Sequence, residues 1–327
     1  MKHLEDKIFE ICNEMQFNEI AMEVFHYQAI NNEIYSLFLQ LMNIDKNKIS
    51  NINEIPFLPI QFFKQHKIVS GKKNVEAVFE SSGTTGSIPS KHYVASLEMY
   101  EKSFLNTFRF FFGNETEYCF LALLPSYLER SGSSLIYMMK VLIDKGIKPF
   151  SNFYLSDFDG LVETLKILKQ KKQKTILIGV TFALLELAET KEIPCFEELI
   201  VMETGGMKGR REELTREELH KILTESFQLP VIHSEYGMTE LLSQGYSKGE
   251  GVFQTPPWLK ILVRDPYDPR TILENGKNGA INIIDLANLY SCAFIETLDL
   301  GKISEKGFHI TGRFDNSDIR GCNLLVL

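Results

Sequence analysis

"KTILIGVTFALLELAETKEIPCFEELIVMETGG", residues 174–206, holds two short apolar runs separated by an amphipathic segment. The runs 175–180 and 198–204 have the length and β-branched content of buried strands, and 181–190 has the length and spacing of a helix. A strand, a helix and a second strand in this order are typical of a parallel βαβ unit. This stretch therefore predicts an α/β fold.

The same alternation continues on both sides of this stretch. Further strands are predicted at 75–81, 118–125 and 230–237, and helices at 95–112, 131–145 and 211–226. The chain is thus expected to form mostly parallel, helix-covered sheets, in which ligands gather at the carboxyl ends of strands.

The two ends of the chain have a different texture. Helical spacing marks 4–15 and 18–43, whereas short strands with Gly turns are expected at 259–264, 280–285, 292–297 and 307–311. We therefore predict a helical segment over 1–55, an α/β core over 56–250 and a smaller β-rich lobe over 251–327.

Composition limits the classes of function. The 327 residues carry a formal net charge of −8, which argues against broad nucleic-acid binding. The five Cys are odd in number, widely spaced and without a CxxC pair, so free thiols in a reducing cytosol are expected. The first residues lack a signal-peptide apolar region, and no run approaches the ~20 apolar residues of a membrane span. These features predict a cytoplasmic protein.

Three predicted strand exits carry unusual residues and should open toward one edge: Ser81–Gly86, Thr204–Gly206 and Glu235–Glu240. The first is "SSGTTG", in which Gly backbone N–H groups and hydroxyls can form an anion nest, so a phosphate loop is predicted. It is not a P-loop of the Gly-Lys-Ser/Thr type, because Gly86 is followed by Ser87. No GxGxxG motif follows a strand.

Two further stretches fit a nucleotide, although each has a plainer interpretation. In "YGMTE", Thr239 can donate to a phosphate and Glu240 can hold Mg²⁺, or Thr239 can cap a helix. Asp299 before a Gly turn can accept both hydroxyls of a ribose, and Arg313 offers a fork of donors, or both are turn residues. His233 is expected to be a packed, hydrogen-bonded imidazole, and Lys208 either neutralises pyrophosphate or is solvated.

In this order the four stretches resemble the acyl-adenylate-forming, AMP-binding ligase superfamily. Within it, "ESSGTTG…HYV", "TGGMKGRR", "HSEYGMTELLSQ" and "SDIRGCNLL" are similar to the acyl-protein synthetases of the bacterial luminescence fatty-acid reductase complex. The resemblance covers about residues 55–327. It implies the fold of the N-terminal domain of these ligases, without the usual C-terminal lysine domain.

The resemblance also implies ATP and Mg²⁺ as cofactors and a role for each matching residue. The ATP phosphates would be cradled by Ser82, Gly83, Thr84, Thr85 and Gly86, the α-phosphate would be touched by Thr239, and Mg²⁺ would be bound by Glu240. The adenine and acyl site would be lined by Gly205, Gly206, Glu235, Tyr236 and Gly237. The ribose would be bound by Asp299 and by Arg313, which lies in the Gly312–Asp315 hinge motif.

Two positions depart from the superfamily pattern. The basic residue expected soon after the phosphate loop comes only at Lys91, beyond Pro89, and the chain ends at Leu327 with no residue to match the catalytic Lys. The luminescence-type synthetases are acylated on a Cys near the C-terminus, and Cys322 is the matching candidate, with Arg320 favouring its thiolate. The alternative is a buried Cys322 in a last strand. The other four Cys are interpreted as core residues.

The predicted reaction is ATP-dependent activation of a carboxylic acid to an acyl-adenylate. The expected substrate is a fatty acid. The acyl group would pass to the Cys322 thiolate and then to a reductase partner. One alternative acceptor is coenzyme A or an acyl carrier protein. A different class of function is a non-catalytic nucleotide-binding subunit of a reductase complex.

Overall fold

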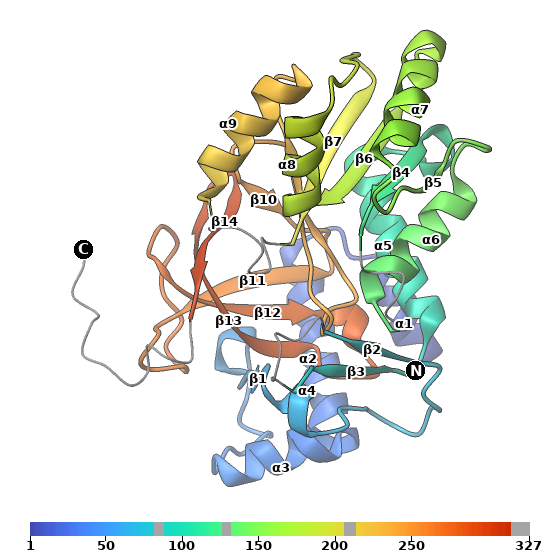
Figure 1. Ribbon diagram of the computed structural model, residues 1–327. Coiled ribbons are helices and arrows are strands. Elements are labelled where there is room, and N and C mark those ends of the chain that lie inside the picture. Colours follow the sequence, from blue (N-terminus) through green and yellow to red (C-terminus); the bar gives the residue numbers. More distant parts are fainter. Residues whose placement is uncertain (82–87, 126–131, 206–213, 315–327) are drawn as a thin grey trace. The chain divides into compact units, whose positions relative to one another are not determined.

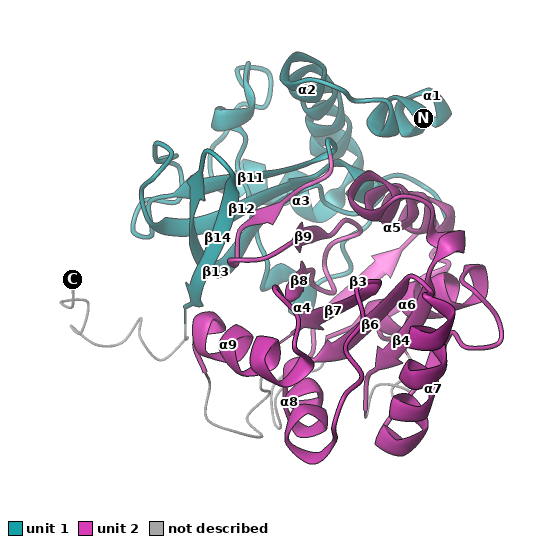
Figure 2. Cartoon of the chain, turned by 90° about the horizontal axis from the view of Figure 1, so that it is seen from above, with its two compact units in different colours: residues 1–74, 257–327 teal, residues 75–256 magenta. Residues whose placement is uncertain are grey.

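The computed structural model describes residues 1–81, 88–125, 132–205 and 214–314. The chain divides into two compact units, coloured separately in Figure 2. Residues Val75–Pro256 form one, which we call the α/β unit, and Met1–Asn74 together with Pro257–Leu327 form the other, which we call the β-rich unit.

The α/β unit contains a mixed sheet with the predicted parallel centre. Its strand order is β10-β9-β8-β7-β6-β4-β5, and β8, β7, β6, β4 and β5 are parallel. The strands are β4 Cys119–Leu123, β5 Asn152–Phe153, β6 Thr175–Val180, β7 Leu199–Thr204, β8 His233–Tyr236, β9 Gly245–Ser247 and β10 Phe253–Gln254. Every residue of β4 and β6 is buried, which explains why both read as continuous apolar runs.

Helices connect these strands, and most of them begin at a side-chain cap. Ser96, Ser133 and Thr215 each accept a hydrogen bond from a first-turn N–H, and Glu218 completes a capping box with Thr215. The helices are α5 Leu97–Phe112, α6 Ser134–Lys145, α7 Phe158–Lys171, α8 Thr181–Thr190 and α9 Arg216–Phe227, with a 3₁₀ turn η2 at Glu115–Glu117. Figure 1 shows α8 beside α9 and α5 beside α6.

The residues on either side of the small-residue loop form a hairpin. Strands β2 (Ala77–Glu80) and β3 (Lys91–Val94) pair antiparallel, with Phe79 opposite His92. The sequence placed this loop between a strand and a helix, and that prediction is wrong, because the short strand β3 precedes α5. Strand β3 has only four residues and follows Pro89, so its period-2 alternation is a weak signal in the sequence.

The β-rich unit has the four predicted C-terminal strands in an antiparallel order, β11-β12-β13-β14. They are β11 Leu259–Arg264, β12 Gly279–Asp285, β13 Phe294–Ser304 and β14 Gly307–Arg313, with a 3₁₀ turn η3 at Leu286–Asn288. The short strand β1 (Leu58–Pro59) adds to β13 in parallel.

The N-terminal helices belong to the same unit. They are α1 Lys2–Phe9, α2 Glu14–Asn31, α3 Glu33–Leu41 and α4 Phe62–Gln65, with a 3₁₀ turn η1 at Ile52–Glu54. The sequence predicted one helix over 18–43, but Asn32 leaves helical geometry (φ −105°, ψ 109°) and caps α3. Its amide also donates to the Ser70 hydroxyl at 3.0 Å and the Ser291 carbonyl at 2.9 Å, which a continuous helix would not allow.

Contacts distant in sequence explain why the units differ from the predicted segments 1–55, 56–250 and 251–327. The buried Gln28 amide donates to the carbonyls of Asn288 and Leu289, and its oxygen accepts from the N–H of Ala293. The N-terminal helices therefore complete the C-terminal sheet rather than forming a segment of their own.

The four described cysteines are free thiols but are not all core residues. Cys119 and Cys292 are buried, and burial raises the pKa of their thiols to about 11 and about 12. Cys12 is exposed and Cys195 is half-buried, so the core prediction is wrong for Cys12. Protonated, buried thiols at Cys119 and Cys292 are poor nucleophiles.

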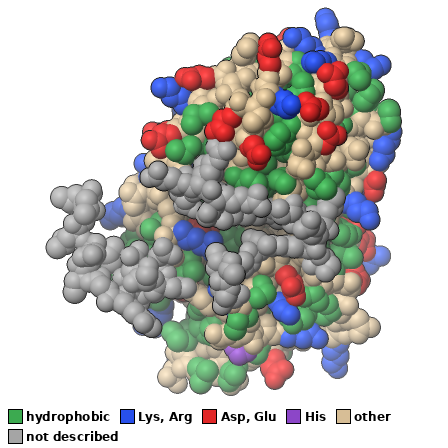
Figure 3. Space-filling view, viewed as in Figure 1, with side chains coloured by type: hydrophobic (Ala, Val, Ile, Leu, Met, Phe, Trp, Pro, Cys, Tyr) green, Lys and Arg blue, Asp and Glu red, His purple; other side chains and the backbone are tan. Residues whose placement is uncertain are grey.

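On the face of the molecule shown in Figure 3, Lys and Arg side chains are interspersed with Asp and Glu side chains. Among the described residues, no helix is both long and apolar enough to cross a membrane.

Candidate active site

The carboxyl ends of β7 and β8 bring two predicted site segments together, as expected for neighbouring parallel strands. Thr204 pairs with Glu235 in the register of the sheet. The Thr204 hydroxyl donates to Glu235 Oε2 at 2.5 Å. The exits at Thr204 and Glu235 therefore open at one edge.

Glu235 is a carboxyl group with an unusual proton affinity. Burial raises its pKa to about 7, the nearby Glu203 charge adds to this, and the hydrogen bond from Thr204 opposes it. Tyr100 and Tyr246 lie close enough that the Glu235 charge also raises their pKa values. Near neutral pH, Glu235 can thus either donate or accept a hydrogen bond.

Backbone geometry fixes the end of β7. Gly205 has φ +70°, in the left-handed region that favours glycine. Its carbonyl accepts from the Thr181 hydroxyl at 3.0 Å. Since Thr181 is the first residue of α8, this contact holds the Gly205 peptide against the end of β6.

Gly237, directly after β8, lies close to the Glu235 side chain. A Cβ on Gly237 would lie 2.3 Å from Glu235 Oε1, so a side chain there would displace the carboxyl group that Thr204 holds. The ring of Tyr236 packs edge-on against Phe253, with centroids 5.8 Å apart. The ring of Tyr236 thus packs against β10, while Gly237 leaves room for the Glu235 carboxyl group.

The segment after Gly237 forms turns and then strand β9, not a helix. The alternative in which Thr239 caps a helix is therefore wrong. Thr239 is half-buried and Glu240 is 5% exposed. Behind this turn, the Ser243 hydroxyl bonds to the Ser103 hydroxyl of α5 at 2.9 Å.

The hairpin β2–β3 reaches the same turn through His92. Its ring Nδ1 lies 2.8 Å from the Thr239 carbonyl oxygen. At the base of the hairpin, the Ser81 N–H donates to the Ser90 carbonyl at 3.0 Å, and the Ser90 N–H donates to Ser81 Oγ at 2.9 Å. The ends of the small-residue loop are therefore fixed in a hairpin that contacts the Thr239–Glu240 turn.

Lys91, the first basic residue after the predicted phosphate loop, forms an ion pair within the hairpin. Its ammonium lies 3.2 Å from a carboxylate oxygen of Glu80, its partner across the hairpin. Both side chains are more than 40% exposed, so the pair contributes little to stability.

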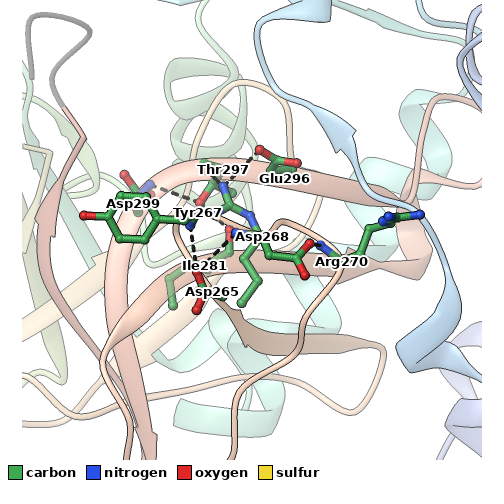
Figure 4. Close-up of polar contacts among 9 residues, drawn as sticks. Asp265, Tyr267, Asp268, Arg270, Ile281, Glu296, Thr297 and Asp299 are labelled. Atoms are coloured by element: carbon green, nitrogen blue, oxygen red, sulfur yellow. Dashed lines mark hydrogen bonds and ion pairs between the residues drawn. The ribbon is translucent and has the colours of Figure 1, made fainter. Parts of the chain in front are cut away.

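The two predicted ribose residues meet in the β-rich unit. Asp299 and Arg313 are register partners on β13 and β14, and Arg313 Nε lies 3.7 Å from Asp299 Oδ1. Figure 4 shows Asp299 on β13 close to Thr297, whose hydroxyl accepts from the Asp299 N–H at 3.1 Å and donates to the Ile281 carbonyl at 2.8 Å. The Asp299 backbone is thereby fixed across two strands.

Two features of the site have no counterpart among the predicted site residues: His92, and the contacts of Glu203 on β7 with α9. His92 occupies a buried position of the alternating strand "KHYV", which is the signal that could have revealed it. Buried Glu203 lies 3.5 Å from Arg216 Nε and 3.6 Å from His220 Nε2 on α9. His233 is packed against Phe112, as predicted, but among the described residues its Nδ1 has no hydrogen-bond partner.

Several predicted site residues lie outside the described ranges. These are Ser82, Gly83, Thr84, Thr85, Gly86, Gly206, Lys208, Asp315 and Cys322. Their assignments stay predictions.

The donor set fits Mg²⁺ only as a nucleotide-bound ion. Among residues 1–81, 88–125, 132–205 and 214–314, no three His, Cys, Asp or Glu side chains group as a metal site. A single carboxylate beside a hydroxyl, as at Glu240 and Thr239, is the protein share expected when phosphate oxygens and water supply the other ligands.

The family model described as "Acyl-protein synthetase, LuxE" matches residues 5–102. This confirms the resemblance predicted from the sequence, although the matched segment starts earlier and ends sooner than 55–327. It includes the β2–β3 hairpin and His92. No curated protein matches the chain.

Solved structures show the fold. A 2-hydroxyisobutyryl-CoA ligase in the postadenylation state is similar with a TM-score of 0.66 at 11% identity, over 91% of this chain and 68% of that one. ATP-bound MatB from Rhodopseudomonas palustris has a TM-score of 0.56 at 18% identity, over 74% of this chain and 49% of that one. The O-succinylbenzoate coenzyme A synthetase of Bacillus subtilis, in complex with ATP and magnesium ion, has 0.50 at 18%, over 74% and 51%.

These likenesses confirm the predicted fold class, that of the adenylate-forming ligases. The chain spans about half the length of MatB and of the O-succinylbenzoate enzyme.

Proposed function

We propose that this chain activates a carboxylic acid with ATP. The observation that carries the proposal is the 2.8 Å contact between His92 and the Thr239 carbonyl, which connects the hairpin of the predicted phosphate loop to the Thr239–Glu240 turn. The strands that flank the predicted phosphate loop are thus joined to the Thr239–Glu240 turn within the α/β unit. The family match at residues 5–102 supports the same chemistry.

In the proposed reaction, a carboxylate oxygen of the acid attacks the α-phosphorus of ATP. The bond from that phosphorus to the oxygen bridging to the β-phosphate breaks, pyrophosphate leaves, and an acyl-adenylate forms. Thr239 would donate to the α-phosphate and Glu240 would hold the ion. Mg²⁺, when bound, would neutralise charge on the phosphates.

The second step would move the acyl group to a thiol. A thiolate attacks the acyl carbon, the bond to the AMP oxygen breaks, and a thioester and AMP result. We propose Cys322 as this thiol, a fatty acid as the substrate and a reductase as the next acceptor. The buried, protonated thiols of Cys119 and Cys292 support a nucleophile elsewhere.

The other acceptors are coenzyme A and an acyl carrier protein. They are distinguished by Cys322→Ser, which would abolish covalently bound acyl if Cys322 is the acceptor and leave soluble thioester formation intact if it is not. Cys12→Ser is the matched control, because Cys12 is the exposed thiol among the described residues. Intact-protein mass spectrometry after incubation with ATP, Mg²⁺ and mixed acids would report the acid and the adduct together.

Acid-dependent exchange of labelled pyrophosphate into ATP tests the first step. Exchange with at least one acid of a panel from acetate to long-chain fatty acids is expected. Folded protein that binds ATP but gives no exchange with any acid would instead favour the non-catalytic nucleotide-binding subunit.

A further inference from the structure

His92 occupies a position where a strand normally places an apolar side chain. Along β3, burial alternates, and His92 and Val94 are the buried residues. His92 is fully buried, opposite Phe79 on β2. An imidazole enclosed in this way costs free energy unless its polar atoms are used.

The Nδ1 atom is used on the backbone of the signature turn. A carbonyl oxygen only accepts hydrogen bonds, so the 2.8 Å contact with the Thr239 carbonyl requires the proton on Nδ1. The tautomer of His92 is thereby assigned by its partner. The bond joins residues 147 positions apart in the sequence.

The contact orients more than one atom, because a peptide group is planar. The Thr239 carbonyl and the Glu240 N–H belong to the same plane and point in opposite directions. Holding the carbonyl oxygen toward His92 therefore directs the Glu240 N–H away from β3. The same plane sets where the Thr239 and Glu240 side chains leave the backbone.

We propose that His92 is a positioning residue, which sets the peptide plane between Thr239 and Glu240 from the β2–β3 hairpin and so tunes the affinity for the nucleotide. This inference rests on the proposed function, since that function gives Thr239 and Glu240 their roles. It assigns to His92 no contact with substrate.

Two substitutions separate positioning from packing. His92→Asn keeps an N–H donor at the position of Nδ1, whereas His92→Leu fills the space without a donor. We expect His92→Leu to weaken ATP binding, measured by calorimetry with and without Mg²⁺, by about tenfold, the effect of losing one hydrogen bond. His92→Asn should bind within about threefold of the wild type. In pyrophosphate exchange, KM for ATP should rise more than kcat falls.

Equal ATP affinity in the wild type and His92→Leu would overturn the inference, as would equal weakening in His92→Leu and His92→Asn. If His92→Leu does not fold, His92→Gln replaces it, because its donor lies one bond further from the backbone and should fail to rescue binding. In another outcome, the wild type binds ATP but gives no pyrophosphate exchange, while His92→Leu binds ATP more weakly and His92→Asn binds it normally. This result would refute the proposed function and leave the inference standing. Wild-type protein that binds no ATP refutes both.

Discussion

The two units use polar side chains differently. In the α/β unit, Thr204, Glu235 and Glu240 lie at the ends of parallel strands or in the turn that follows. In the β-rich unit, Arg264, Glu296 and Asp299 lie along antiparallel strands, and their partners are set by the sheet. Strand ends gather groups around a ligand, whereas charges within a sheet mostly stabilise the sheet.

This difference leads to an expectation for variants. Removing a charge from the middle of the β-rich sheet should lower the free energy of unfolding more than it changes pyrophosphate exchange. Removing one from the turn after β8 should do the reverse. The four predictions below test this contrast.

The largest effect is expected at Arg264, which is 4% exposed by its side chain. Its Nη2 donates to Glu296 Oε1 at 3.1 Å and to the Thr297 carbonyl at 3.0 Å. Arg264→Met leaves a half-buried carboxylate and a buried carbonyl without a donor, so denaturant unfolding should show a loss of about 3–5 kcal/mol.

The control is the double variant Arg264→Met/Glu296→Leu. Replacing both charges should recover most of the loss, apart from about 1 kcal/mol for the Thr297 carbonyl. If Arg264→Met left stability unchanged but abolished exchange, the charge would belong to a ligand site and the contrast between the units would fail.

At Glu240 we expect the reverse pattern. Glu240→Gln keeps the volume but removes the charge proposed to hold Mg²⁺, so exchange should fall by about 10²–10³-fold. Thermal unfolding should change little. Thr239→Ser, which keeps the hydroxyl, is the control and should retain most activity; exchange by Glu240→Gln within threefold of the wild type would contradict the assigned role.

The third prediction concerns pH and Glu235. Its pKa rises from an ordinary 4.5 to about 7 on folding, so between these values the folded state binds the proton that the unfolded state has lost. Stability must therefore fall as pH increases through this window and stay lowered above it. As the pH rises from 4.5 to 8, the free energy of unfolding of Glu235→Gln should increase relative to that of the wild type by up to about 3 kcal/mol.

Thr204→Val supplies the matched control for this titration. The Thr204 hydroxyl donates to the carboxyl group and stabilises its charged form, so its removal should raise the pKa of Glu235 further and shift the window to higher pH. A difference between Glu235→Gln and wild type that does not vary with pH would show that Glu235 keeps its ordinary pKa.

Much of this arrangement could be predicted from the sequence where local patterns decide it. The parallel strands β4, β6 and β7 are predictable because they are buried on both faces and their sequences are mostly apolar. The four C-terminal strands β11–β14 are predictable from their length and their Gly turns, whereas the two-residue strand β1 is not. The edge shared by Thr204 and Glu235 followed from parallel pairing alone.

The remainder depends on partners that leave no periodic signal. The break at Asn32 reflects bonds to Ser70 and Ser291, and the grouping of the N-terminal helices with β12 and β13 reflects Gln28, whose partners lie about 260 positions away. The alternation in "KHYV" indicates that His92 is buried, but its acceptor is a backbone carbonyl, which no residue type identifies. Such contacts require coordinates.

The smallest stability effect is expected at Arg313, an exposed residue at the end of β14. Its side chain is 68% exposed and its distance of 3.7 Å from Asp299 is long, so Arg313→Ala should change the free energy of unfolding by less than about 1 kcal/mol. If Arg313 binds the ribose as proposed, KM for ATP should nevertheless rise several-fold, and Arg313→Lys should not restore it, since a fork of donors is lost. An unchanged KM alongside unchanged stability would leave Arg313 as a solvated side chain of β14 without a role in nucleotide binding. Charges of the β-rich sheet would then serve the sheet even at its last strand, and the nucleotide contacts would have to come from elsewhere.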